Sequence, residues 1–239
     1  MEKVSIIIPT FNRFLYLLNT IASIKDQTYP DIEIIVVNDK STQEEYYTHD
    51  WNKEGVIMIH LPENTKTTFG YVCAGHVRNT GIEKATGHYI AFCDDDDIWF
   101  PSKLHLQIDA MKETGCRMSS TDGLLGHGVY NPRKRYMKYN SENCYPMLKE
   151  KYNKYGSDAL DNGFPKIWTM EFLKIHNCVI CSSVVMEKTL LDDIGNMKCV
   201  NNGNEDYDCW LRALGHTNLV YVDDICFYYD NNHGNGQNY

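Results

Sequence analysis

The segment Ile90-Ala91-Phe92-Cys93-Asp94-Asp95-Asp96-Asp97 decides the interpretation of this chain, because an apolar strand-like run leads directly into four aspartates. The next residues, Ile98-Trp99-Phe100-Pro101, lead into a segment with helical spacing of its apolar residues. Carboxylates packed this closely repel one another unless a cation or solvent relieves them. A solvated acidic turn is the alternative. The position of the run between a buried strand and a helix favours a site for Mg²⁺ or Mn²⁺, which prefer hard oxygen ligands.

The residues around this segment alternate between strand-like and helix-like patterns. We expect strands at 4–8, 32–37, 56–60 and 88–93, and amphipathic helices at 14–24, at 74–85 and from Pro101 onward, with Asn12 capping the first helix. Continuous apolar strands separated by helices indicate an α/β fold with a parallel sheet covered on both faces. Ligands bind at the carboxyl ends of the strands in such sheets. Three polar segments should therefore meet in one crevice: 9–12, 38–39 and 94–97.

The second half of the chain changes character at about residue 120. Periodicity fades over 123–174, where Asn131-Pro132 predicts a turn and where basic and aromatic residues gather between 129 and 170. This segment is either a solvated insertion with its own small core or a lid over the binding site. Regular pattern returns with a strand-like run at 178–186, helices at 190–194 and 205–214, and strands at 219–222 and 225–229.

The composition is that of one globular domain of 239 residues, with 32 acidic and 23 basic side chains and a net charge of −9. Such a charge disfavours nucleic acid as a partner. The nine cysteines are irregularly spaced, and several lie in apolar runs, so we expect reduced, buried thiols rather than a disulfide framework. Cys178-x-x-Cys181 is expected to serve packing rather than zinc binding. Neither a signal peptide nor a membrane-spanning run is evident, which predicts a soluble, cytoplasmic protein.

The chain resembles the family-2 glycosyltransferases with the GT-A fold. The resemblance covers about residues 1–115 and 177–233, and the segments that carry it are Val4–Arg13, Gln27–Pro30, Glu33–Ser41, Arg78–Ile82, Ala85–Ile90, Asp94–Pro101 and Glu205–Arg212. It implies a mixed, mostly parallel sheet flanked by helices in a single domain over 1–239. In that domain, 1–115 would bind the nucleotide sugar. Residues 116–239, with an irregular insertion at about 123–174, would bind the acceptor.

The resemblance also implies roles for individual residues. Asp39 would recognise the nucleotide base, with helix capping as the alternative, and Asp97 would orient the site from behind. Asp206 would be the general base, with Glu205 positioning it or the acceptor. The remaining nucleotide contacts are Pro9, Thr10, Asn12, Arg78, Asp94 and Asp95, and the metal ligands are Asp96 and His233. The His233 segment lacks the arginine that family members often carry, and Asn38 and Lys40 depart from the commoner Asp-Asp-Gly-Ser pattern.

The function expected from these features is transfer of one sugar from a nucleoside-diphosphate sugar, favoured as a UDP-sugar, to an acceptor hydroxyl. The acceptor is a glycan, a protein or a small molecule. The reaction would invert the anomeric configuration and use Mn²⁺ or Mg²⁺, and Trp210-Leu211-Arg212 fits the non-processive pattern. A non-catalytic nucleotide-sugar-binding or lectin-like module is the alternative. A sugar nucleotidyltransferase fits less well, because no glycine-rich loop follows the first strand.

Overall fold

The computed structural model describes residues 1–201 and 203–232 and contains one ten-stranded mixed sheet. Its main path runs β3-β2-β1-β4-β9-β6-β10-β5, with β7 paired to β6 and β8 paired to β10. Strands β3, β2, β1 and β4 are parallel, and β9 joins them antiparallel. The strands are β1 Val4–Thr10, β2 Ile32–Asn38, β3 Val56–His60, β4 Tyr89–Phe92, β5 Ile98–Trp99, β6 Met118–Gly126, β7 Met137–Lys138, β8 Ile167–Trp168, β9 Val185–Glu187 and β10 Leu219–Asp230.

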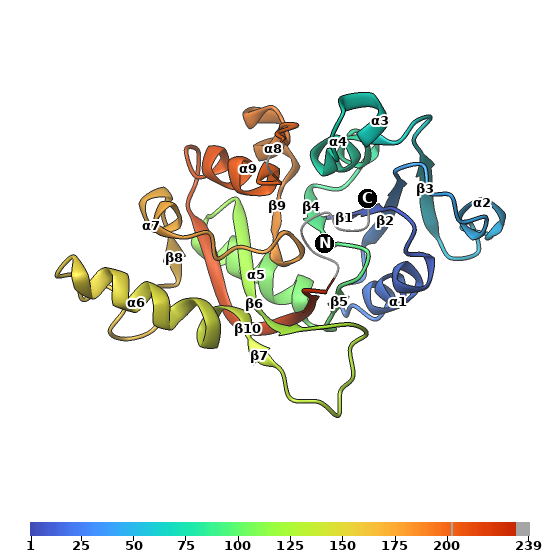
Figure 1. Cartoon of the computed structure of the whole chain (residues 1–239). Helices are drawn as coiled ribbons and strands as arrows, with labels where there is room; N and C mark the ends of the chain where they lie inside the picture. The colour runs from blue at the N-terminus through green and yellow to red at the C-terminus, as the bar shows by residue number, and fades with distance from the viewer. Residues whose placement is uncertain (202, 233–239) are drawn as a thin grey trace.

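The helices cover both faces of the sheet (Figure 1). They are α1 Phe14–Lys25, α2 Glu45–Thr48, α3 Thr65–Phe69, α4 Ala74–Lys84, α5 Lys103–Thr114, α6 Tyr145–Lys154, α7 Met170–Ile175, α8 Lys188–Ile194 and α9 Glu205–Ala213, with a π-helix at Tyr139–Cys144 and a 3₁₀ turn at Cys181–Ser183. Helices α6 and α7 lie on the side of the molecule where β8 pairs with β10. Within the described ranges, no helix has both the length and the apolar character needed to cross a membrane.

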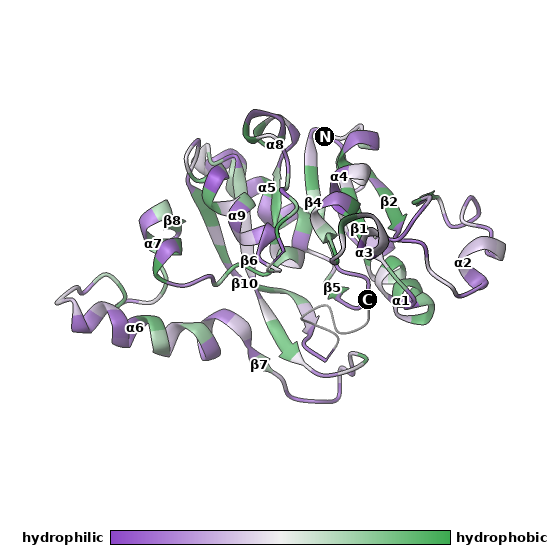
Figure 2. Ribbon diagram, turned by 45° about the horizontal axis from the view of Figure 1, so that its top comes forward, coloured by the Kyte–Doolittle hydropathy of each residue, from purple (hydrophilic) through white to green (hydrophobic). Residues whose placement is uncertain are grey.

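The core has two layers, one on each face of the sheet, because successive side chains of a strand point to opposite faces. In β1, Ile6 and Ile8 belong to the layer that α1 and α5 cover, whereas Ile7 belongs to the layer under α4, α8 and α9. Strands β1, β2 and β4 are accordingly apolar along most of their length, because helices cover both of their faces (Figure 2).

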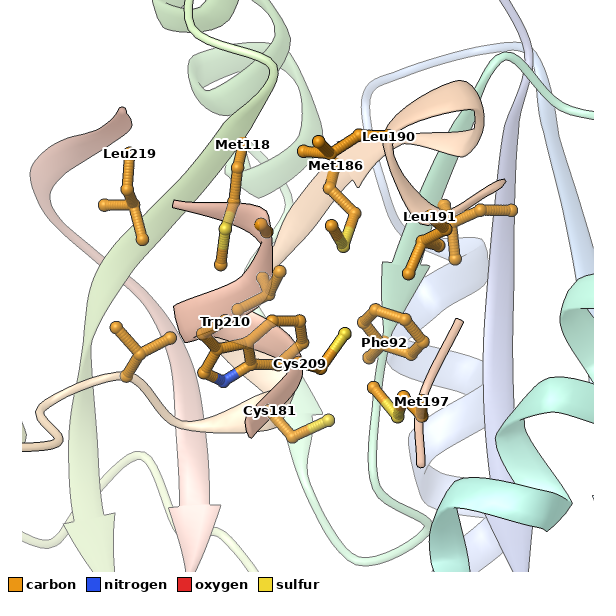
Figure 3. Packing of buried hydrophobic residues seen from close by; sticks show 14 of the residues in the cluster. Phe92, Met118, Cys181, Met186, Leu190, Leu191, Met197, Cys209, Trp210 and Leu219 are labelled. Atoms are coloured by element: carbon orange, nitrogen blue, oxygen red, sulfur yellow. The ribbon is translucent and has the colours of Figure 1, made fainter. Parts of the chain in front are cut away.

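Helix α9 is fixed to its layer by two buried side chains on one face. Cys209 and Trp210 are fully buried, and the Trp210 ring lies 5.7 Å from that of Phe92 on β4. Figure 3 shows Trp210 and Cys209 among Phe92, Met118 and other members of the cluster. This packing places the first residues of α9 beside the carboxyl end of β4.

The structure confirms the α/β fold and the four strands and three helices expected in the first half, with ends that move by a few residues. Asn12 does not cap α1. It adopts a left-handed backbone conformation (φ 53°), and its Oδ1 instead accepts the backbone N–H of Thr42 at 2.8 Å. The N-cap is Arg13, and the side chain of Gln43 accepts the N–H of Phe14. The sheet is mixed and not parallel throughout, because β9, β5 and the short strands β7 and β8 are antiparallel to their neighbours.

Two expectations for the second half were wrong. The run 178–186 is a strand only from Val185 onward, because Ser182 and Ser183 turn the chain and use their side chains for other hydrogen bonds. The segment 123–174 is more regular than its weak periodicity suggested. It completes β6 and contains β7, the π-helix, α6 and α7.

The cysteines differ in part from the expectation of free thiols. Cys73 and Cys199 form a disulfide across 126 residues of sequence. The seven other cysteines are free and buried, as expected, including Cys178 and Cys181. Sequence spacing could not reveal the pair, because only the folded chain brings α4 beside the segment that precedes α9.

Lys103 at the start of α5 provides a test of this core. Its ammonium group is fully buried, donates to Gln107 Oε1 at 2.6 Å and lies 4.1 Å from the Trp99 ring centre. Burial lowers the pKa of Lys103 to about 8. The unfolded chain therefore holds more protons between pH 8 and the ordinary lysine value, and the stability contributed by this site rises with pH in that window.

We expect Lys103→Met to be more stable than the wild type by about 1–3 kcal/mol at pH 7. The advantage should shrink as the pH rises from 8 toward the ordinary lysine pKa of 10.5, above which the wild-type lysine is neutral in both states. Urea unfolding at several pH values measures the difference. If Lys103→Met is no more stable than the wild type, or if its extra stability grows with pH, then burial does not destabilise the charged form of Lys103.

Candidate active site

A cleft of about 880 Å³ opens at the carboxyl ends of β1 and β4, where the α/β architecture predicts a ligand site. Both halves of the chain contribute to its wall. The polar and aromatic residues of the wall include Arg13, Arg78, Asp94, Asp95, Asp96, Tyr139, Asn143, Asn177, Glu205, Asp206 and Tyr229.

Three of the four consecutive aspartates lie on this wall, and two arginines hold them. Arg78 on α4 donates to Asp94 Oδ1 at 2.6 Å. Arg13, between β1 and α1, donates to Asp95 Oδ1 at 2.9 Å and to Asp96 Oδ2 at 3.0 Å. Because the arginines come from different elements, the acidic turn also fixes β1 and α4 relative to β4.

Asp97 has a different position and is not on the cleft wall. Its Oδ1 accepts the backbone N–H of Asp230 at 2.9 Å, and its carbonyl accepts the hydroxyl of Thr20 at 2.8 Å. It is fully buried. Asp97 therefore joins the acidic turn to the end of β10 and to α1, a position behind the site that fits the supporting role expected for it.

Negative charge exceeds positive charge at this turn, since four carboxylates face two guanidinium groups. Burial, followed by the neighbouring Asp97 and Asp95, raises the pKa of Asp96 to about 10. Burial also raises the pKa of Asp95, against the opposing effect of Arg13. A divalent cation would favour the ionised form of these groups, and their oxygens are hard ligands, so the residues fit Mg²⁺ or Mn²⁺.

The described residues do not by themselves supply a full set of metal ligands. Among the described residues, no group of three or more histidine, cysteine or acidic side chains is arranged to hold a metal ion. His233, expected as a ligand, lies outside the described residues. A cation bound through Asp96 would therefore take part of its coordination from water or from the phosphates of a substrate, as Mg²⁺ usually does.

Glu205 and Asp206 form the first turn of α9 and face the same cleft. Burial raises the pKa of Asp206 to about 6, against the opposing charge of Arg78. Its Oδ1 accepts the N–H of Tyr207 at 2.6 Å. Glu205 is also buried, and its Oε2 has no hydrogen-bond partner among the described residues. A carboxylate with a pKa near 6 in a cleft is suited to accept a proton at neutral pH.

The structure brings seven of the expected site residues to one cleft: Pro9, Arg78, Asp94, Asp95, Asp96, Glu205 and Asp206. Thr10 and Asn12 are not on its wall. The buried Thr10 hydroxyl donates to Asp95 Oδ2 at 2.6 Å, so Thr10 supports the acidic turn from inside the sheet. Asn12 holds the loop after β2.

Asp39 is also absent from the cleft wall and is fully buried. Its Oδ1 accepts the N–H of Thr65 at 2.8 Å, and its Oδ2 accepts the hydroxyl of the same residue at 2.7 Å. Burial raises the pKa of Asp39 despite these bonds. This carboxylate thus holds Thr65, the first residue of α3, whose N-cap is Asn64. It does not cap α2, the helix that follows β2, and base recognition by Asp39 stays a prediction.

Several residues of the cleft were not singled out from the sequence. Arg13 could have been found, because a cation at the carboxyl end of β1 is expected close to the acidic turn at the end of β4. Tyr229 lies near the acidic residues, and burial followed by the charges of Asp97, Asp94 and Asp96 raises the pKa of its hydroxyl. Tyr139 and Asn143 carried no signal of their own beyond the aromatic character of their segment.

Tyr139 and Asn143 reach the cleft because Asp122 anchors the π-helix that carries them. The buried Asp122 carboxylate accepts the N–H groups of Gly123, Asn140 and Ser141 and the Ser141 hydroxyl, at 2.7–3.0 Å. Asn140 also donates to the carbonyl of Cys178 at 3.2 Å. The wall on this side of the cleft is therefore tied to both β6 and the 178–181 segment.

Comparison with known proteins agrees with this architecture. The family model described as glycosyl transferase family 2 matches residues 5–172. The putative teichuronic acid biosynthesis glycosyltransferase TuaG of Bacillus subtilis is 36% identical over 124 residues, which are 49% of this chain and 45% of that protein. The Escherichia coli protein named UDP-Glc:alpha-D-GlcNAc-diphosphoundecaprenol beta-1,3-glucosyltransferase WfaP is 29% identical over 226 residues, which are 92% of this chain and 76% of that protein. The chain spans less than half the length of TuaG and of three Rickettsia glycosyltransferases that it also matches.

Solved structures share the fold. TarS of S. aureus in complex with UDP-GlcNAc aligns with a TM-score of 0.67 at 17% identity, over 99% of this chain and 61% of that one. The mannosyltransferase PcManGT of Pyrobaculum calidifontis, in complex with GDP-Man and Mn²⁺, aligns with a TM-score of 0.61 at 19% identity, over 95% of this chain and 56% of that one. The family model covers well over half of the chain, and the chain belongs to glycosyl transferase family 2.

Proposed function

We propose that this protein transfers a single sugar from a UDP-sugar to a hydroxyl group of a sugar-containing acceptor, with inversion at the anomeric carbon. The observation that carries the proposal is the shared cleft. It combines an acidic turn suited to a cation and a diphosphate with a separate half-buried carboxylate, Asp206, whose pKa of about 6 suits a general base.

The donor end of the cleft is formed by Asp94, Asp95 and Asp96 with Arg13 and Arg78. A divalent cation held by Asp96, with Asp94 nearby, would stabilise the negative charge of a departing nucleoside diphosphate. UDP is supported as the nucleotide by the relatives named as UDP-Glc-dependent enzymes and by the structural neighbour with bound UDP-GlcNAc. Arg78 also holds Asp94 in place for this role.

Asp206 is proposed to take the proton from the acceptor hydroxyl as that oxygen attacks the anomeric carbon. A single displacement on the face opposite the diphosphate inverts the configuration. Glu205, buried beside it, would position the acceptor hydroxyl or the base. Arg212 in the same helix does not belong to this machinery, since it binds Asp208 and the carbonyls of Ile194 and Asn196.

The acceptor side is proposed to be the wall made of Tyr139, Asn143 and Asn177. An aromatic face and amide groups suit the apolar face and the hydroxyl groups of a sugar ring. The acceptor named for the relative WfaP is also a sugar, joined to a lipid diphosphate. Of the insertion expected to form a lid, the π-helix contributes residues to the cleft wall and α6 contributes none.

Substitution of Asp96 by Asn tests the metal assignment. We expect UDP to bind the wild type more tightly with Mn²⁺ present, and Asp96→Asn to weaken this cation-dependent binding by at least about tenfold, because a coordinating carboxylate is lost. Isothermal titration calorimetry with UDP, with and without Mn²⁺, measures both. Asp109→Asn, an exposed aspartate on α5, is the matched control and should bind like the wild type. UDP binding by Asp96→Asn that still responds fully to Mn²⁺ would contradict the assignment.

Substitution of Asp206 by Asn tests the general base. Transfer should fall by about 10²–10⁴-fold while UDP binding is retained. Wild-type kcat/KM should rise with pH through about 6 as the Asp206 carboxyl ionises.

The same variant should be more stable than the wild type at pH 7, by about 1–3 kcal/mol. The pKa of Asp206 is higher in the folded chain than in the unfolded chain, so its ionisation destabilises the fold as the pH rises from about 4 through 6. Thermal unfolding at pH 4.5 and 7 should therefore show an advantage for Asp206→Asn only at the higher pH.

Asp208→Asn, in the same turn but paired with Arg212, is the control and should retain transfer. Retained transfer by Asp206→Asn would exclude it as the base. A wild-type protein that binds UDP but transfers no sugar from any donor would instead support the non-catalytic binding module.

A further inference from the structure

We propose that Cys73 and Cys199 form a reversible thiol–disulfide site that fixes one rim of the cleft. Cys73 is the residue at the start of α4, the helix that carries Arg78, and Cys199 lies in the segment that leads to Glu205 at the start of α9. The disulfide thus joins the two segments that deliver a donor-side arginine and the acidic pair. The effect on ligand binding, though not the thiol chemistry, rests on the proposed function.

The position of Cys73 favours breakage of the disulfide by an external thiol. Its Sγ accepts the backbone N–H of His76 at 3.3 Å and caps an eleven-residue helix. A helix N-terminus stabilises a thiolate, and a thiol of lower pKa leaves faster in exchange. Cys73 is 1% exposed whereas Cys199 is half-buried, so the attacking thiolate reaches Cys199 and Cys73 departs as the stabilised thiolate.

The chemistry balances with a dithiol as the reductant. One thiolate of the dithiol bonds to Cys199 Sγ and breaks the Cys73–Cys199 bond. Its second thiol then displaces Cys199 and leaves as a cyclic disulfide, and two electrons pass to the protein. Oxidation is the reverse, with a low-molecular-weight disulfide such as oxidised glutathione receiving the two electrons.

The other cysteines do not compete for this exchange. Among the described residues, all seven are buried and free. Burial raises the pKa of Cys93 and Cys181 well above the ordinary thiol value, which lowers their thiolate content and their reactivity. Cys199 is more exposed than any of these seven thiols, so an external thiol reaches the Cys73–Cys199 pair through Cys199.

Other contacts hold the chain against α4 just before Cys199. Asn79 on α4 donates to the carbonyl of Met197 at 2.7 Å and accepts its N–H at 3.1 Å. A Cβ on Gly75 would lie 2.9 Å from the carbonyl oxygen of Lys198, so this backbone packs tightly against α4. These contacts hold the chain up to Lys198 whether or not the disulfide is present.

Beyond Cys199, the chain enters the cleft wall at Asn201, Gly203 and Asn204, and Tyr71, Val72 and Ala74 form the wall on the other side of the disulfide. With the disulfide formed, both segments are held together before a ligand arrives. With it reduced, the covalent link between Cys73 and Cys199 is lost, and ligand binding bears more of the entropic cost of holding the two segments together. The oxidised protein should therefore bind the donor nucleotide more tightly.

The first experiment compares the two redox forms of the full chain. The protein is oxidised with oxidised glutathione or reduced with dithiothreitol, and non-reducing peptide mapping by mass spectrometry locates the bond. UDP affinity in Mn²⁺ is then measured by calorimetry on both forms. We expect a Cys73–Cys199 peptide only in the oxidised form and UDP binding that is about threefold to tenfold weaker in the reduced form.

Variants separate the redox effect from damage to the fold. Cys73→Ser retains an oxygen at the helix cap and should bind UDP like the reduced wild type under both conditions. Cys116→Ser, at a free cysteine beyond the end of α5, is the control and should keep the full redox response. In Cys199→Ser, the pH midpoint of alkylation of Cys73 should lie below the ordinary thiol value of about 8.5.

Each readout can overturn the proposal. Absence of the linked peptide after oxidation, an alkylation midpoint at or above 8.5, or equal UDP affinity of the two forms would each contradict it. Failure of the proposed function would look different, because neither form would then bind UDP while the peptide map and the alkylation midpoint still report the thiol chemistry.

Discussion

The crowding of four carboxylates at the end of β4 is the constraint on which the rest of the structure depends. Three parts of the chain stabilise these four groups: Arg78 on α4 holds Asp94, Arg13 and Thr10 near the end of β1 hold Asp95, with Arg13 also holding Asp96, and the backbone of β10 holds Asp97. The cost of bringing like charges together is offset only when β1, α4 and β10 converge on one point. The acidic turn thus organises the cleft as well as supplying its chemistry.

The parts of the fold that local pattern predicted are those where burial is continuous. Strands β1, β2 and β4 are apolar on both faces, and helices cover them, so their sequence and their position agree. The prediction of a strand over 178–186 was wrong because an apolar composition is equally compatible with a buried turn. There the Ser182 hydroxyl accepts the N–H of Asp94, and the Ser183 hydroxyl forms a hydrogen bond with that of Ser120. The turn is therefore as fully buried as a strand would be.

The candidate site likewise contains some residues that the sequence predicts and others that it does not. Its acidic residues were predictable, because strand ends meet at one edge of a sheet and the carboxylates follow those ends directly. Other partners from distant segments were not predictable: Thr65 binds both oxygens of Asp39, and Cys73 pairs with Cys199. Such pairings depend on tertiary packing between residues that no local period relates. Asn143 and Asn177 belong to the same class, since amides are common in loops and carry no signal on their own.

The single carboxylate of Asp122 has a consequence for how such a protein can change. The π-helix that forms one wall of the cleft begins at three hydrogen bonds to that group, beyond a strand that belongs to the common sheet. None of the residues that hold the acidic turn lies in the 127–176 segment. Lengthening or replacing that segment would leave the acidic turn unaltered as long as the bonds to Asp122 survived. The proposed acceptor wall could therefore diverge between proteins while the proposed donor end stays the same.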